Sequence, residues 1–165
     1  MKTSKLTMMG LCAALAMIFS FIESQIPTML PPGMKLGLPN IAIVFVLYRV
    51  GVKEAYAVNL VRVALTSLLF GSVLSLAYSL VGGMLSLTAM VLMKRFNSFS
   101  SVSVSVVGGL FHNIGQVAVA YFVTDTAQLF TYYLPMLLVS GTVAGVVIGL
   151  VAGIAVKRLA KWTPR

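Results

Sequence analysis

The sequence predicts an all-α integral membrane protein with six transmembrane helices in a single domain, residues 1–165. Of its residues, 59% are apolar and only 9% are charged, and the mean hydropathy is +1.03. An ordinary soluble domain is about 45–50% apolar and about 25% charged. A soluble domain of this length has too little interior for so much apolar surface, so we expect lipid to be the solvent.

Charges and turn residues divide the chain into six apolar segments, at about residues 6–22, 36–50, 55–70, 73–93, 102–123 and 130–156. A transmembrane helix needs about 17–25 residues. The first, fourth and fifth segments fit this length, and the sixth is long enough to tilt or protrude. The second and third are short, and the second begins with Gly37 and Pro39. We therefore expect a short or broken second span, entered from an irregular loop that protein or a water-filled cavity covers.

The basic residues predict the orientation, because membrane proteins keep Lys and Arg in cytoplasmic loops. The formal net charge is +9, from 12 Lys and Arg against 3 Asp and Glu. With six spans and a cytoplasmic N-terminus, the cytoplasmic side holds ten of the twelve basic residues: Lys2, Lys5, Arg49, Lys53, Lys94, Arg95, Lys157, Arg158, Lys161 and Arg165. Both termini are thus predicted to be cytoplasmic, and the charge requires no nucleic-acid partner.

A cleaved signal peptide is the alternative for the first segment, because Lys2 and Lys5 precede an apolar stretch. A signal-peptide apolar region is usually about 7–15 residues. This one has 17, and no clean small-x-small cleavage site follows it. A transmembrane helix is the preferred interpretation.

Several kinds of chemistry are missing from the sequence. No G-x-x-x-x-G-K-[ST] motif occurs, so ATP-driven work needs a partner. Asp125 is the only aspartate and Cys12 the only cysteine. Two glutamates and one aspartate on separate loops cannot hold Mg²⁺ for prenyl transfer, and no catalytic triad or carboxylate pair is present. We expect neither an enzyme nor a bound metal or cofactor.

Polar side chains inside predicted spans mark a candidate solute site, because such residues usually face an interior or a cavity. Arg62 lies nine residues past Lys53, which places it about 14 Å deep at about 1.5 Å per residue. Asn59 lies three residues earlier, on the same helix face. Arginine offers five donors and no acceptor, which suits a carboxylate or a phosphate.

A second polar group lies at a similar depth in the fifth segment. His112 follows Val102 by ten residues, which corresponds to a depth of about 15 Å. Asn113 and Gln116 follow in the next turn. A solute site is the interpretation for the whole set, and the alternative is that these side chains only join helices together.

The predicted outer loop, residues 23–40, contains four prolines and two glycines, which impose an irregular path. Lys35 is the only basic residue on that side. One interpretation is a lid over an outward-facing cavity, with Lys35 and Asn40 touching the solute and Glu23 ordering the loop. The alternative is a rigid external connector.

Small residues four apart allow helices to approach closely. Gly141, Gly145, Gly149 and Gly153 form such a series in the sixth segment, where we expect packing within the bundle. Gly10 and Ala14 form a pair in the first segment, which faces either the bundle or a partner subunit.

Several separated motifs follow one another along the chain. They are Glu23-Ser-x-Ile-Pro27, Pro32-Gly-Met-Lys-Leu-Gly-Leu-Pro-Asn40, Leu60-x-Arg62, Ser67-Leu-x-Phe70-Gly71, Ser79-Leu-x-Gly82-Gly83 and His112-Asn113-x-Gly115-Gln116. From about Leu6 to Ala155 the sequence with these motifs resembles the Gx transporter family, also described as heptaprenyl diphosphate synthase component I. That family is similar to the substrate-binding S components of energy-coupling factor (ECF) transporters.

The resemblance implies a six-helix S-component fold in the bacterial cytoplasmic membrane. It also implies a transmembrane coupling protein of the EcfT type and two cytoplasmic ATPases as partners. In S components an Ala-x-x-x-Ala-like motif on the first helix contacts the coupling protein, and Gly10-x-x-x-Ala14 takes its place here. The solute is expected near the outer face, under the first loop.

The leading hypothesis is an S-component-like importer subunit that binds a small anionic or amphipathic solute. Arg62 and Lys35 would offset its charge, and hydrogen bonds would come from Asn40, Asn59, His112, Asn113 and Gln116. The family description links the solute to isoprenoid or quinone precursors. One alternative is a non-catalytic membrane component of a heptaprenyl diphosphate synthase in menaquinone biosynthesis. Another is a standalone secondary transporter, which the scarcity of membrane carboxylates and of internal symmetry disfavours.

Overall fold

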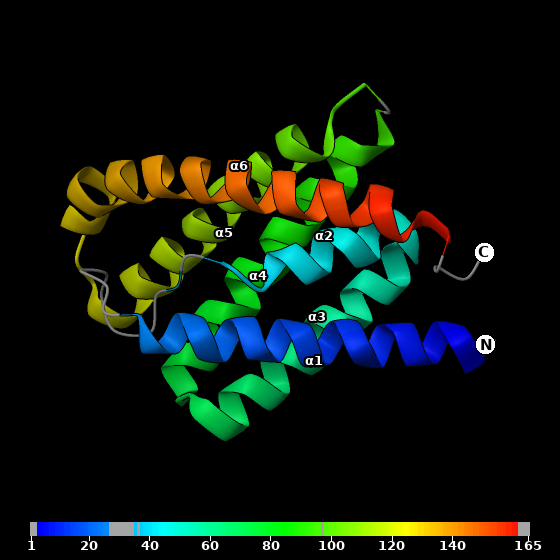
Figure 1. Cartoon of the computed structure of the whole chain (residues 1–165). Helices are drawn as coiled ribbons and strands as arrows, with labels where there is room; N and C mark the ends of the chain where they lie inside the picture. The colour runs from blue at the N-terminus through cyan, green and yellow to red at the C-terminus, as the bar shows by residue number, and fades with distance from the viewer. Residues whose placement is uncertain (1–2, 27–34, 36, 97, 162–165) are drawn as a thin grey trace.

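The computed structural model describes residues 3–26, 35, 37–96 and 98–161, and these residues form a bundle of α-helices (Figure 1). A π-helical turn, Leu129–Tyr133, leads into the last long helix, and a 3₁₀ turn, Leu159–Lys161, follows it. The described part of the chain contains no strand, so the predicted all-α class is confirmed. The helices are α1 Thr3–Gln25, α2 Asn40–Arg49, α3 Val52–Phe70, α4 Val73–Arg95, α5 Ser101–Thr124 and α6 Leu134–Arg158.

Four helical segments are long and apolar enough to cross a membrane: Ser4–Gln25, Val73–Arg95, Ser101–Thr124 and Leu129–Arg158. The third helix, α3, has 19 residues and carries Lys53, Glu54 and Arg62. The second helix, α2, has only 10 residues, which cover about half of a hydrocarbon core about 30 Å thick. A short second helix was the expectation, and α2 is short.

The first helix is longer than the sequence predicted. It continues to Gln25, whereas the apolar segment ends at Ile22. Glu23 therefore lies on the last turn of α1 and not in the outer loop. Glutamate is a good helix former. Glu23 therefore interrupts the apolar segment without ending the helix.

Helix α1 begins and α6 ends at the same end of the bundle (Figure 1). Several basic residues make contacts near the ends of their helices. Arg49, at the end of α2, donates through Nε to the carbonyl of Val156 in α6 at 2.8 Å. Lys94, at the end of α4, donates to the carbonyl of Leu47 at 2.6 Å. The Lys5 ammonium pairs with the Glu54 carboxylate at 2.5 Å. By the positive-inside rule, the sequence predicts that this end of the bundle faces the cytoplasm.

The glycine series of α6 packs against α5, as the sequence predicted. A Cβ atom on Gly145 would lie 2.6 Å from the Cα atom of Val106, and one on Gly149 would lie 2.6 Å from that of Val102. Any larger residue at these positions would force the two backbones apart. The close approach fixes α5 relative to α6, and with it the polar side chains that α5 carries.

The apolar core surrounds α2. Ile43, Val44, Val46 and Leu47 are at most 1% exposed, and α2 packs against α1, α3 and α6. Many large apolar side chains on the outer faces of the bundle are exposed, as expected for a surface in contact with lipid. The core thus lies around α2, and polar side chains collect beyond its N-terminus.

Candidate functional site

A cluster of buried polar side chains lies around the segment that leads into α2. Seven of the eight predicted site residues are at most 5% exposed, and Lys35 is half-buried: the seven are Glu23, Asn40, Asn59, Arg62, His112, Asn113 and Gln116. The structure therefore brings most of the predicted residues into one region of the interior. They come from α1, α2, α3, α5 and the segment before α2. The predicted outer loop was residues 23–40, and its residues 27–34 and 36 lie outside the described residues.

Arg62 lies at the centre of the cluster, and its guanidinium is 3% exposed. Its Nε and Nη2 atoms donate to the Oδ1 atom of Asn59 at 3.2 and 2.9 Å. The Glu23 carboxylate lies within electrostatic range of the guanidinium. However, Lys5–Glu54 is the ion pair found among the described residues, and Arg62 makes none there. Among the described residues, only the Nε and Nη2 atoms of Arg62 have an acceptor, the Oδ1 atom of Asn59.

Gly82 and Gly83 on α4 make room for the two polar helices on either side. A Cβ atom on Gly83 would lie 3.3 Å from the Nη2 atom of Arg62. One on Gly82 would lie 3.2 Å from the Nδ1 atom of His112 and 3.3 Å from the side chain of Gln116. This glycine pair lets the side chains of α3 and α5 approach α4 closely, and so places Arg62 and His112 on its two sides.

Gln116 holds the backbone of Lys35 against α5. With the amide oriented to satisfy its neighbours, its oxygen accepts from the Lys35 N–H at 3.0 Å and its nitrogen donates to the Lys35 carbonyl at 3.1 Å. The same oxygen accepts from the Nε2 atom of His112 at 3.2 Å. His112 therefore carries its proton on Nε2. Gln116 thus bonds both His112 and the backbone of Lys35, and these contacts hold the segment before α2 against α5.

Glu23 fastens the same segment from α1. Its Oε1 atom accepts from the N–H of Gly37 at 2.5 Å and from that of Leu38 at 3.4 Å. Gly37 has φ +93°, which glycine adopts without strain. Because α2 begins at Asn40, the carboxylate also lies near the positive end of the α2 dipole.

Lys35 adds a second cation to the cluster. Burial lowers the pKa of its ammonium group, the Glu23 carboxylate opposes that shift, and the Arg62 guanidinium adds to it. Two cations thus face one carboxylate in this part of the interior. These three groups together therefore carry an excess of positive charge.

Three of the predicted residues lie away from this cluster. The amide nitrogen of Asn113 donates to the Leu137 carbonyl of α6. Its neighbour His112 faces α4 because successive helical residues are about 100° apart. Gly10 and Ala14 lie on an exposed face of α1, and a Cβ atom on Gly10 would meet nothing within 4 Å.

Two hydroxyl groups near the cluster did not enter the sequence prediction. Thr66 follows Arg62 by four residues, and Ser20 precedes Glu23 by three, so each shares a helix face with a predicted site residue. They are 4% and 1% exposed, and their oxygen atoms have no hydrogen-bond partner among the described residues. The helical spacing was visible in the sequence, but serine and threonine are too common in membrane helices for spacing alone to single them out.

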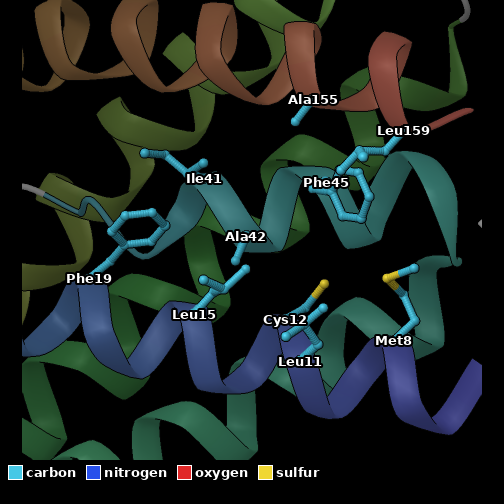
Figure 2. Close-up of a pocket in the computed structure, with 10 residues that line it drawn as sticks. All are labelled: Met8, Leu11, Cys12, Leu15, Phe19, Ile41, Ala42, Phe45, Ala155 and Leu159. Carbon is cyan, nitrogen blue, oxygen red and sulfur yellow. The ribbon is translucent and has the colours of Figure 1, made fainter. Parts of the chain in front are cut away.

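A separate cavity of about 320 Å³ lies between α1, α2 and the end of α6 (Figure 2). Its lining is apolar, with Leu11, Leu15 and Phe45 among its residues and the Cys12 thiol as a weak hydrogen-bonding group. None of the buried polar residues described above lines it. In the part of the chain that the structure describes, no group of three or more His, Cys, Asp or Glu side chains could hold a metal ion.

Comparisons with known proteins agree with this architecture. A family model described as heptaprenyl diphosphate synthase component I matches residues 12–155. No curated protein matches the sequence. The structure is similar to a solved S component of a bacterial ECF transporter, with a TM-score of 0.67 and 21% sequence identity over the whole of both chains. The fold is thus that of an S component in a multi-pass membrane protein.

Proposed function

Because the chain belongs to the heptaprenyl diphosphate synthase component I family, known also as the Gx transporter family, and has the fold of an ECF S component, we propose that it is the substrate-binding membrane subunit of an ATP-driven importer. It works in the bacterial cytoplasmic membrane and has no catalytic activity of its own. Its solute is small and is either anionic or amphipathic, such as an isoprenoid or quinone precursor.

The observation that carries this proposal is the buried guanidinium of Arg62, which has no carboxylate partner within 4 Å among the described residues. A charged side chain in the middle of a membrane costs about 2.5–3.5 kcal/mol or more. A helical bundle does not need such a residue for packing. A negatively charged solute would offset the cost and would use the donors that Asn59 leaves free.

The contacts divide the candidate residues into two groups. Arg62 and the Lys35 ammonium are available to the solute, and Asn59 orients the guanidinium. Gln116 bonds the backbone of Lys35, and the Oε1 atom of Glu23 accepts from the N–H groups of Gly37 and Leu38, so we assign these groups to the positioning of that segment. Asn113 contributes to the packing of α5 against α6.

The partners are a transmembrane coupling protein of the EcfT type and two ATPases. The Gly10–Ala14 face of α1 is exposed and free of large side chains at these two positions, so a partner helix can approach its backbone closely. Since the sequence has no P-loop, the ATPases must supply the energy.

Affinity purification of the full chain from its own membranes tests this proposal. We expect a coupling membrane protein and two ATPases to co-purify. We also expect the purified chain alone to retain a small anion without ATP, as seen by native mass spectrometry. Isolation without these partners and without a retained solute would refute the proposal.

The family description favours one second candidate, a non-catalytic membrane component of a heptaprenyl diphosphate synthase. This candidate predicts that a soluble chain rich in aspartate co-purifies and makes the prenyl diphosphate. The two candidates therefore differ in the partner that the same purification recovers.

A further inference from the structure

Thr66 differs from other threonines in the helices of this protein. Thr88, Thr124 and Thr142 each donate to the carbonyl four residues earlier, at 2.8, 2.9 and 2.8 Å. A hydroxyl on a helix in an apolar environment usually forms this hydrogen bond to the carbonyl of the preceding turn. Thr66 is 4% exposed, yet its hydroxyl has no such bond and no other partner among the described residues. A buried hydroxyl without a partner costs about 1–3 kcal/mol.

Thr66 lies one turn from Arg62 on the same face of α3. Among the described residues, Arg62 has donors left over after its two bonds to Asn59. A hydroxyl donor and a guanidinium on one helix face together suit an anionic group with several oxygen atoms.

A second set of free groups lies on α1. Glu23 uses Oε1 for the N–H groups of Gly37 and Leu38, whereas its Oε2 atom is buried and has no partner among the described residues. The Ser20 hydroxyl, one turn earlier on the same face, is 1% exposed and is also without a partner there. A carboxylate oxygen only accepts, so it requires a donor, such as a hydroxyl or an amine.

The two sets face the same part of the interior. The rings of Phe21 on α1 and Phe70 on α3 are 5.1 Å apart, which places the outer turns of these helices side by side. Glu23 and Arg62 interact electrostatically but form no ion pair, so their charged atoms are more than 4 Å apart. The hydrogen-bond donors of Arg62 and Thr66 on α3 therefore lie opposite the unpaired carboxylate oxygen of Glu23 on α1.

We propose that the solute binds at two points: an anionic group binds to Arg62 and Thr66, and a hydroxyl or amine on the same molecule donates to Glu23 Oε2 beside Ser20. This inference rests on the proposed function and narrows its substrate class. The solute is an anion that also carries a hydrogen-bond donor. An anion with no hydrogen-bond donor would bind only Arg62 and Thr66 on α3. It would leave the Oε2 atom of Glu23 buried without a donor.

Calorimetric titration of the purified full chain with two matched pairs of probes tests the proposal. The carboxylates are pentanoate and 5-hydroxypentanoate, and the phosphates are pentyl phosphate and 5-hydroxypentyl phosphate. We expect the hydroxylated member of at least one pair to bind about tenfold more tightly than its parent, the scale of one hydrogen bond to a charged group. The pair that binds distinguishes a carboxylate from a phosphate.

Two variants separate the two points of contact. Thr66→Val should weaken both members of the binding pair by about five- to tenfold. Ser20→Ala should reduce the preference for the hydroxylated member and leave the parent unchanged. Both variants should melt at the same temperature as the wild type or higher, because each removes a hydroxyl that has no partner. The control Thr142→Val changes a hydroxyl that bonds its own helix and should change no affinity.

Three results would overturn the two-point site: no binding of any probe, equal affinity within each pair, or unchanged affinities in Thr66→Val. Recovery of the coupling protein and ATPases with the wild-type chain is scored separately. If the partners co-purify but the hydroxyl has no effect, this inference fails and the proposed function stands. If the partners are absent and no solute is retained, the proposed function fails as well.

Discussion

Replacement of Glu23 by alanine should release the segment that precedes α2. The Oε1 atom of Glu23 accepts two backbone N–H groups, at 2.5 Å from Gly37 and 3.4 Å from Leu38. A hydrogen bond to a charged group is worth about 1.5–3 kcal/mol. The short bond supplies most of the total and the long one little, so the loss is about 2–3 kcal/mol.

This free energy sets the expected rate of hydrogen exchange. A change of about 2–3 kcal/mol corresponds to about 30- to 150-fold in the opening equilibrium, since about 1.4 kcal/mol is tenfold. We expect the amides of Gly37 and Leu38 to exchange faster by that factor in Glu23→Ala, measured by mass spectrometry in detergent. Glu23→Gln keeps an uncharged acceptor and should show a smaller increase.

Glu54→Ala is the matched control. It removes a carboxylate that is paired with Lys5 at 2.5 Å but is partly exposed, and such pairs contribute little. The amides before α2 should exchange at the wild-type rate in this variant. Unchanged exchange at Gly37 and Leu38 in Glu23→Ala would refute the assignment of Glu23 as the residue that holds this segment.

Three further predictions concern packing, charge and partner binding. Gly145→Val should lower the melting temperature of the protein, because a Cβ atom there would lie 2.6 Å from Val106 Cα and overpacking costs about 1–3 kcal/mol; an unchanged melting temperature would contradict the close packing of α5 on α6. Binding of whichever probe pair the protein accepts, carboxylate or phosphate, should weaken as the pH rises through the alkaline range, because burial lowers the pKa of Lys35 and the ammonium loses its proton earlier than an exposed lysine does. Lys35→Met should bind weakly and show no such pH step in the same titration, and an identical step in that variant would assign it to another group. Ala14→Leu should reduce co-purification of the coupling protein without changing the melting temperature, and full recovery would place the interface elsewhere.

Arg62 and His112 lie beside neighbouring residues of α4, Gly83 and Gly82, and this similar depth could be predicted because the rise of an α-helix is fixed. Counting residues from the charged end of each segment placed both side chains near the same depth. The structure adds the element between them, the Gly82–Gly83 pair of α4, which lets both side chains approach. The depth of a side chain along its helix can be counted from the sequence, whereas the direction in which the side chain points depends on how the helices rotate against one another.

That rotation explains why adjacent residues of α5 differ in their neighbours. Asn113 bonds α6, and His112 contacts the segment before α2 through Gln116. Sequence reasoning grouped these residues because they are close along the chain. The sequence does not reveal that the Thr66 hydroxyl lacks a partner among the described residues, because another helical threonine, Thr142, donates to the carbonyl of its own helix.

The most direct test of the central claim, that a buried arginine binds an anionic solute, is native mass spectrometry of the purified chain and its Arg62→Ala variant in the absence of ATP. We expect the wild type to retain a small anion and the variant to bind it at least tenfold more weakly. Arg62→Lys, which keeps a charge but not the planar fork of donors, should retain it to an intermediate extent. Equal retention of the same molecule by the wild type and by folded Arg62→Ala, or no retention by either, would contradict it.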